Sequence, residues 1–335
     1  MFGRNLRFYR LRNNLSQQAL ADSIGVEAMS ISNYENGKRQ PSYETVNKIA
    51  NALGVRVGSL MANVVNNEVL VTGNLRASGL GPSEFAYVED YISRSTQNYL
   101  AINEWLGIAA YSNKNLLSSS ILSNDDINAA YVRNVLGLAP QGPIASILSI
   151  IENLGIYIVE IDNVSNSFSG YATRGAKTGL NIIAINGNMS PVRKRFTLLH
   201  EFIHILYNDS TDEKTVDDIS GRVLLPADDL KRELGIKRHR ISVADIRYIH
   251  DEYGASANCI ALRAFQEGII SRNQYYEYRD IRIGCQSIPD ERPSRLNQLV
   301  CRAVNEGVIS LSKAAELLGI SYSDAENLCY GDTYE

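Results

Sequence analysis

The chain has 335 residues, of which 44% are apolar and 21% charged, and its formal net charge is −4. Chains of this length usually divide into two or three domains, and the apolar share is enough for packed cores. The net charge excludes a surface that binds polyanions everywhere, and no apolar run has the ~20 residues of a transmembrane helix. The N-terminus lacks the apolar core of a signal peptide. We therefore expect a cytoplasmic protein with no membrane partner.

The spacing of the four cysteines does not match a known disulfide or metal-binding motif. Cys259, Cys285, Cys301 and Cys329 form no CxxC pair, which favours reduced thiols over a disulfide framework. The same spacing offers little support for a metal site made of cysteines.

Basic residues are concentrated in the first 62 residues. This segment holds eight Lys or Arg and four Asp or Glu, a net charge of +4, so the remainder carries −8. A basic module attached to an acidic body favours nucleic-acid contact by the first part.

The same segment predicts five short helices. Ser16 can cap a helix over SQQALADSIG that ends at Gly25, and the next helix, over EAMSISNYENG, ends at Gly37. Two helices joined by a tight turn can place the second one in the major groove of DNA.

SQQALADSIGV, SISNYENGKRQPS and IANALGV resemble the phage-repressor (Xre/Cro-type) helix-turn-helix family. The resemblance implies that residues 1–65 bind a double-stranded DNA operator, and we expect a homodimer because single modules bind weakly. It also implies a salt bridge between Arg10 and Glu35 beneath the recognition helix. The residues implied to face base edges are Glu27, Ala28, Met29 and Asn33. Those implied to hold phosphates are Gln17, Ser30, Lys38 and Arg39. The alternative is a small helical bundle that binds protein.

The middle of the chain predicts an α+β domain. Residues 63–82 are polar and rich in Gly and Asn, which indicates a boundary, and the apolar spacing that follows predicts a helix. The later predicted elements are a helix over 125–136, a helix from Pro143 to Gly155, the strand IYIVEI, a hairpin over SFSGYATRGAKTGLNIIAING, and a helix opened by Pro191. This order indicates a small antiparallel sheet.

RKRFTLLHEFIHIL predicts a metal site. His200 and His204 lie one helical turn apart on one face, where two imidazoles can bind one Zn²⁺ at ~2.0–2.1 Å. Glu201 can accept a proton from water and return it to a leaving amine. Downstream, Glu213 can supply a carboxylate ligand, and Asp217 can hydrogen-bond the far nitrogen of a histidine.

Alternatives to this set remain open. Asp212 or Asp217 could be the third ligand in place of Glu213, and the two histidines could simply belong to a core. His239 and His250 are predicted to be surface or core residues.

INGNMSPVRKRFTLLHEFIHIL and EKTVDDISGRVLLP resemble the ImmA/IrrE metallopeptidases, over roughly residues 143–270. VADIRYIHDEYGASANCIALRAFQEGIIS resembles the helical tail of that family. The resemblance implies a zinc endopeptidase that cuts a helix-turn-helix repressor in a stress, phage or toxin–antitoxin response, with single-stranded DNA as a candidate trigger. VDDIS departs from the AN.FA pattern that follows the third-ligand glutamate in the family. This departure weakens the support that the resemblance gives to Glu213 as the third ligand. Ile203 replaces a small residue.

The sequence as a whole predicts a multi-domain protein. An all-α helix-turn-helix domain (1–65) is followed by a linker and helical region (66–142), an α+β zincin-like metallopeptidase domain (143–270) and a C-terminal helical region (271–335). The last region has a weak helix-turn-helix look in LSKAAELLGISYSDA, but its low basic content favours packing or a partner surface.

The predicted function is a DNA-binding transcriptional regulator with a zinc-dependent endopeptidase domain. One alternative is a repressor or antitoxin whose peptidase-like domain senses a ligand or partner with little catalytic activity. Another is a peptidase whose N-terminal module docks protein.

Overall fold

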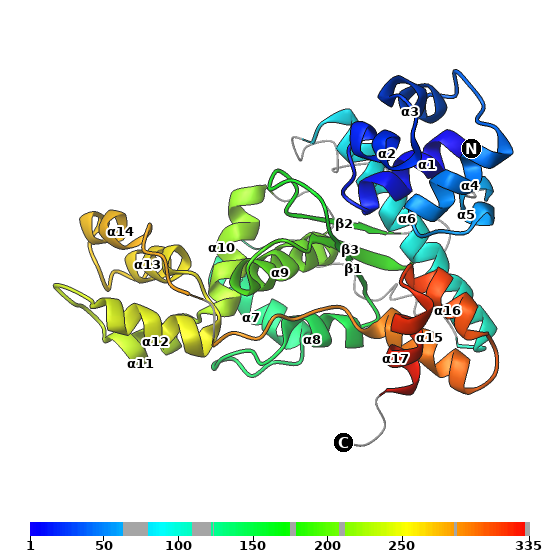
Figure 1. Ribbon diagram of the computed structural model, residues 1–335. Coiled ribbons are helices and arrows are strands. Elements are labelled where there is room, and N and C mark those ends of the chain that lie inside the picture. Colours follow the sequence, from blue (N-terminus) through cyan, green and yellow to red (C-terminus); the bar gives the residue numbers. More distant parts are fainter. Residues whose placement is uncertain are drawn as a thin grey trace. The chain divides into compact units, whose positions relative to one another are not determined.

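The computed structural model describes residues 1–62, 80–108, 122, 124–174, 179–207, 212–284 and 287–331 (Figure 1). The chain forms two compact units. The first comprises Met1–Ala110, Ile161–Phe168 and Ser294–Glu335, and the second comprises Tyr111–Glu160 and Ser169–Pro293. Residues 1–65 fall in the first unit, and most of residues 143–270 fall in the second.

Five helices open the first unit, as the sequence predicts. The hydroxyl of Ser16 caps the second helix by accepting the Ala19 N–H at 2.9 Å. Gly25 then turns the chain in the left-handed region, with φ 73°, where a residue with a Cβ pays roughly 1–2 kcal/mol. The helices are α1 (Phe2–Arg12), α2 (Gln17–Ile24), α3 (Ala28–Glu35), α4 (Tyr43–Ala52) and α5 (Val57–Met61). Their shared core includes the fully buried Leu6, Leu20, Ile31, Ile49 and Leu60.

A long helix, α6 (Pro82–Trp105), packs against α1 within the same unit. Asp90 of α6 accepts two hydrogen bonds from Arg4 Nε, at 2.8 and 2.9 Å. The guanidinium of Arg94 lies 4.2 Å from the centroid of the Phe8 ring and donates to Asn5 Oδ1 at 2.5 Å. The helix that follows residues 63–82 is therefore a structural support for the first helices.

The C-terminal helices of the first unit repeat the local scheme of α2 and α3. They are α15 (Arg295–Asn305), α16 (Leu311–Leu318) and α17 (Tyr322–Tyr330). Ser310 caps α16, and Gly319 turns the chain toward α17 with φ 64°. Arg12 Nη2 donates to the carbonyls of Leu318 at 3.1 Å and Gly319 at 2.8 Å. Arg12 at the end of α1 therefore donates hydrogen bonds to carbonyls at the end of α16, which have no donor within their own helix.

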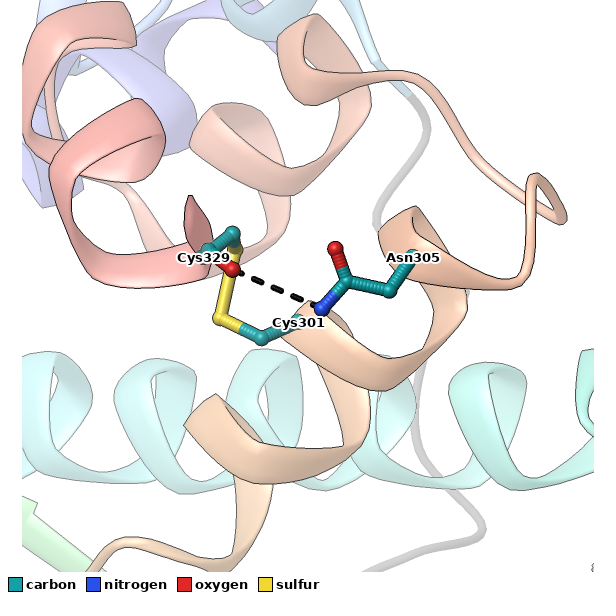
Figure 2. The surroundings of a disulfide bond; sticks show 3 residues. All are labelled: Cys301, Asn305 and Cys329. Atoms are coloured by element: carbon teal, nitrogen blue, oxygen red, sulfur yellow. Dashed lines mark hydrogen bonds between the residues drawn. A yellow bond between two sulfur atoms is a disulfide. The ribbon is translucent and has the colours of Figure 1, made fainter. Parts of the chain in front are cut away.

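Cys301 of α15 and Cys329 of α17 form a disulfide (Figure 2). The prediction of reduced thiols is wrong for this pair. Helices α15 and α17 pack together, so the two Cα atoms lie 4.6 Å apart although 28 residues separate them in the sequence. The absence of a CxxC pair says nothing about cysteines that are brought together by packing. Cys259 is a buried free thiol, and burial raises its pKa to about 12. Cys285 lies outside the described residues.

Reduction of this disulfide is expected to loosen α15–α17. A cross-link that closes a loop of this length stabilises the folded segment by about 3.6 kcal/mol in the chain-entropy model. Amide hydrogen exchange over residues 295–330 should accelerate when a reductant is added to the wild type. In the double variant Cys301→Ser/Cys329→Ser, exchange should already be fast and should not respond to the reductant. Equal exchange with and without reductant in the wild type would contradict the stabilising role.

The second unit is built on a three-stranded sheet. Its strands, β1 (Tyr157–Ile161), β2 (Gly170–Arg174) and β3 (Asn181–Asn186), lie in the order β1-β3-β2. Strands β2 and β3 pair antiparallel, with Gly170 opposite Ile185, which confirms the predicted hairpin. All six residues of β3 are buried, as expected for a central strand. Strand β2 is an edge of this sheet.

Helix α9 packs on the sheet, and the helices of this unit together with the sheet confirm the α+β class. Helix α8 begins at Ile147, later than predicted from Pro143, because Ser146 supplies its cap. The remaining helices are α7 (Asp125–Val135), α8 (Ile147–Asn153), α9 (Pro191–Tyr207), α10 (Glu213–Leu224), α11 (Ala227–Leu234), α12 (Val243–Tyr253), α13 (Ala257–Gln266) and α14 (Arg272–Tyr278). Helix α9 packs against β2, β3, α8 and α10. None of the helices in the described part of the chain is long and apolar enough to cross a membrane.

Candidate functional site

Helix α9 carries the predicted site and is anchored by a buried lysine. Pro191 occupies its first turn, as predicted. Lys194 is 1% exposed, and its Nζ lies 2.6 Å from Glu160 Oε1 and 2.9 Å from Asp290 Oδ1. Burial lowers the pKa of Lys194, but its hydrogen bonds to Asp290 and Glu160 outweigh that effect and raise it. The lysine therefore stays charged and ties α9 to the end of β1 and to the segment after α14.

Arg195 is a second buried anchor of α9. It forms an ion pair with Glu291 and donates to the carbonyls of Ile144 and Ala145. Glu291 also accepts the Leu148 N–H at 2.7 Å, at the start of α8. Sequence reasoning took this basic run only as the start of a helix. Its acidic partners are Glu160, 34 residues upstream of Lys194, and Asp290 and Glu291, each 96 residues downstream of the cation that it pairs with, so no local pattern indicates them.

His200, His204 and Glu213 converge at one point. Their ligand-type atoms all lie within 4.8 Å of one another. The two Nε2 atoms are 3.1 Å apart, and Glu213 Oε2 lies 3.0 Å from His200 Nε2. Glu213 Oε1 lies 3.6 Å from His204 Nε2. Two ring nitrogens this close need a proton or a cation between them, because their lone pairs otherwise repel each other.

Asp217 and Asp212 take different positions around this cluster. Asp217 Oδ1 lies 2.9 Å from His200 Nδ1, where it can accept the ring N–H and turn the Nε2 lone pair toward Glu213. Asp212 instead caps α10, because its carboxylate accepts the N–H of Thr215 at 3.0 Å and the hydroxyl of Thr215 at 2.7 Å. Among the described residues, the geometry favours Glu213 over Asp212 as a ligand.

The electrostatic surroundings of His200 are negative. Burial lowers its pKa, but the hydrogen bond with Asp217 and the charges of Glu201, Asp217 and Glu213 outweigh burial and raise the pKa above its ordinary value. A site that stabilises a positive imidazole also stabilises a bound cation, since both respond to the same carboxylates.

Glu201 lies against the edge strand of the sheet. It is 8% exposed, and a Cβ built on Gly170 would stand 2.8 Å from Glu201 Oε1 and 2.6 Å from a methyl of Thr197. Only glycine lets β2 approach α9 this closely. The sequence predicts the hairpin but gives no sign that Gly170 must be a glycine, because the contact with α9 is formed between distant residues.

The donor set fits zinc. Two neutral imidazoles and one carboxylate are typical ligands of catalytic zinc sites, which keep one position open. Four-coordinate zinc holds its ligand atoms about 3.4 Å apart, and the three separations here run from 3.0 to 3.6 Å. Among the described residues, neither of the two remaining histidines belongs to this cluster; His250 is buried and His239 is exposed.

The predicted DNA-contacting residues lie on and around α3. Met29 is 66% exposed, and Glu27, Lys38 and Arg39 are also exposed. Ala28, Ser30 and Asn33 are half-buried. A methionine that packs in a core is usually buried, whereas Met29 is exposed on a short helix. This exposure favours a binding surface on α3.

A salt bridge supports α3 from beneath. Arg10 Nε lies 2.5 Å from Glu35 Oε1, and the Glu35 side chain is 2% exposed. This is the pair that the resemblance implied. Gln17 Nε2 also donates to Glu35 Oε2, at 2.7 Å. The Gln17 amide is therefore held by Glu35 at the base of α3, which constrains any phosphate contact that it makes.

Comparisons with known proteins match both regions of the chain that carry these residues. The family model described as Helix-turn-helix matches residues 6–60, and the one described as IrrE N-terminal-like domain matches residues 151–265. An uncharacterized HTH-type transcriptional regulator of Methanocaldococcus jannaschii is 40% identical over 52 residues, which cover 16% of this chain and 79% of that protein. The chain belongs to the helix-turn-helix family of transcriptional regulators. It also carries an IrrE N-terminal-like domain, so the two resemblances stated from the sequence are confirmed.

Other relatives match this helix-turn-helix regulator through its first residues. The uncharacterized HTH-type transcriptional regulator YqaE of Bacillus subtilis is 36% identical over 69 residues, which are 21% of this chain and 60% of YqaE. The cryptic phage CTXphi transcriptional repressor RstR of Vibrio cholerae is 34% identical over 67 residues, which are 20% of this chain and 60% of RstR. The chain thus spans about three fifths of the length of each of these two relatives.

Metal analysis tests the ligand set. We expect the regulator to bind about one zinc per chain, and His204→Ala to lose it, because two remaining ligands hold zinc poorly. Asp217→Asn should keep the stoichiometry but weaken zinc affinity by roughly 10–100-fold. His239→Ala, at an exposed histidine outside the cluster, is the matched control and should bind zinc like the wild type. Zinc retained at full affinity by His204→Ala would contradict the assignment.

Proposed function

We propose that this regulator binds operator DNA through its first residues and acts as a zinc-dependent endopeptidase through its second unit. The observation that carries the peptidase proposal is the convergence of His200, His204 and Glu213 beside Glu201. His200 and His204 belong to α9 and Glu213 belongs to α10. A chance HExxH match on α9 would not be expected to have a carboxylate of another helix at its histidines.

Each residue of the site has a distinct role in this proposal. His200, His204 and Glu213 would hold the zinc, and Asp217 would fix the tautomer of His200. When bound, zinc supplies Lewis acidity for peptide hydrolysis. Glu201 takes a proton from the attacking water and passes it to the leaving amine. Its carboxylate is held between α9 and β2 by the close approach at Gly170, which limits its motion.

The edge strand β2 offers a place for the substrate. An extended peptide can add to a sheet edge through main-chain hydrogen bonds. Strand β2 lies at such an edge and contacts Glu201 through Gly170. A peptide paired there would pass close to the proposed base. The substrate that we favour is a repressor of the helix-turn-helix type, and single-stranded DNA is the trigger that we would test first.

DNA binding is proposed through α3 and the basic turn after it. Met29, Glu27, Ala28 and Asn33 would face base edges, while Ser30, Lys38, Arg39 and Gln17 would position the module on phosphates. RstR, a relative by its first residues, is named a phage transcriptional repressor. A homodimer on a two-fold related site in the cytoplasm is the form that we expect.

A sensing repressor is the second candidate function. A pocket of about 620 Å³ lies beside the histidine cluster and shares Asp217 with it. A domain of this kind could report a bound ligand to the DNA-binding unit without cutting a peptide.

Salt-dependent binding separates the two classes of DNA contact. In the full chain, Arg39→Ala should weaken binding to all duplexes similarly and reduce the slope of log affinity against log salt by about 1. Asn33→Ala should change the preference among sequences, because it removes a base-edge contact. Lys237→Ala, which removes an exposed positive charge outside the first unit, should change neither property. The measurement is fluorescence anisotropy with labelled duplexes from the gene's upstream region. An absence of salt-sensitive binding would refute the operator proposal.

Substitution of the proposed base tests the peptidase. Glu201→Gln is nearly isosteric, so it should keep zinc and DNA binding, but its amide cannot take a proton. The loss of a general base typically costs ~10²–10⁴ in rate. The assay is incubation with repressors encoded nearby, with and without single-stranded DNA, followed by mass spectrometry for fragments. Glu252→Gln, on the exposed side of α12, is the matched control and should cut like the wild type. Equal fragment yields from Glu201→Gln and the wild type would refute the mechanism, and no fragments under any condition would favour the sensing repressor.

A further inference from the structure

A pocket of about 620 Å³ lies within the second unit, next to the histidine cluster. Its walls come from α9, α10, α12, α13 and the segment 281–283. The apolar part of the wall is formed by Val192, Phe196, Leu224, Leu262, Ile281 and Ile283. Pockets for small molecules typically measure ~300–1,000 Å³ and are mostly apolar with a few polar groups. This pocket matches both properties.

The polar groups of the pocket indicate the chemistry of a ligand. Arg193 and Arg282 are exposed cations that line it, the buried Arg263 adds a third cation, and Asp217 and Asp218 add two carboxylates. His250 lines it too and is 2% exposed, and its Nδ1 donates to the Ala255 carbonyl at 2.9 Å. His250 Nε2 is buried and has no hydrogen-bond partner among the described residues. A buried polar atom left unpaired destabilises the fold, so a ligand donor that reaches Nε2 gains a hydrogen bond.

The pocket lies beside the proposed reaction centre and is not part of it. Asp217 lines it, whereas Glu201, His204 and Glu213 do not, and neither do the residues of β2. A peptide paired with the edge of β2 would therefore not contact this pocket through β2. This separation, together with the volume, favours a small molecule over the substrate peptide as the occupant.

We propose that this pocket binds a small, largely apolar molecule that carries one anionic group and one hydrogen-bond donor. The apolar body would lie against Phe196, Leu262 and Ile283. The anion would face Arg193 and Arg282, and the donor would face His250. The occupant serves as a signal for this regulator in addition to the single-stranded DNA trigger considered above.

Two residues belong both to the pocket and to the surroundings of His200. Phe196 lies one turn before His200 on α9, with ring centroids 6.4 Å apart, and Asp217 Oδ1 lies 2.9 Å from His200 Nδ1. A ligand that moves either side chain changes the orientation of the His200 ring. Occupancy is therefore coupled to the metal site, and the coupling is reciprocal. Only this coupling rests on the proposed zinc site.

Anilinonaphthalene sulfonate is a suitable probe, because it combines apolar rings, one N–H donor and one sulfonate. We expect the full-length protein to bind it at one site with enhanced fluorescence. Leu262→Trp, which fills the pocket from a half-buried position, should weaken binding by about tenfold or more, or 1.4 kcal/mol. Arg282→Gln should weaken it less. Val243→Trp, which adds the same side chain at an exposed position of α12 outside the pocket, is the matched control and should bind like the wild type.

The outcomes are distinct. No probe binding by the wild type, or equal binding by Leu262→Trp, overturns the proposal. Displacement of the probe by a cleavable repressor peptide also overturns it, because the pocket would then be a peptide subsite. Coupling predicts that the probe shifts zinc affinity at least severalfold in the wild type but not in Leu262→Trp. If no variant binds zinc, the peptidase proposal fails while the probe titration still decides the ligand site.

Discussion

The charges of Lys194 and Arg195 hold the second unit together around helix α9. Both side chains are almost fully buried, and each forms an ion pair with carboxylates from distant parts of the chain. Burying a cation costs several kcal/mol unless such partners are in place, and removing one partner of a buried pair typically costs about 3–5 kcal/mol. The helix that carries His200, Glu201 and His204 therefore has its position fixed by pairs that form only when Glu160, Asp290 and Glu291 have folded around it.

In both units, a single carboxylate takes part in more than one interaction. In the first unit, the carboxylate of Glu35 receives both Arg10 and Gln17, so one buried anion connects α1, α2 and α3. In the second, Asp217 belongs to the histidine cluster and to the wall of the neighbouring pocket. A residue that is shared in this way couples two regions, because neither can rearrange without changing the hydrogen bonds of the other.

Features that depend on local sequence were predictable, and those that depend on distant pairing were not. The caps at Ser16 and Gly25, the Pro191 start of α9 and the His200–His204 face all follow from spacings within one or two helical turns. Glu213 and Asp217 could be placed because they too lie one turn apart on the next helix. The partners of Lys194, the approach of Gly170 to Glu201 and the Cys301–Cys329 disulfide join residues 28 to 96 positions apart. No periodicity encodes such contacts, since they result from how the elements pack.

The first unit is discontinuous in sequence, and this affects how the protein is made. Helices α15–α17 belong with α1–α6, yet they are encoded after nearly all of the second unit. Ribosomes add roughly 5–20 residues per second, and domains generally fold as they emerge. The carbonyls of Leu318 and Gly319 that receive Arg12 leave the ribosome on the order of 10 s or more after the helix-turn-helix. A nascent chain therefore contains all of its second unit before the last three helices of its first unit are made, which gives folding a fixed temporal order.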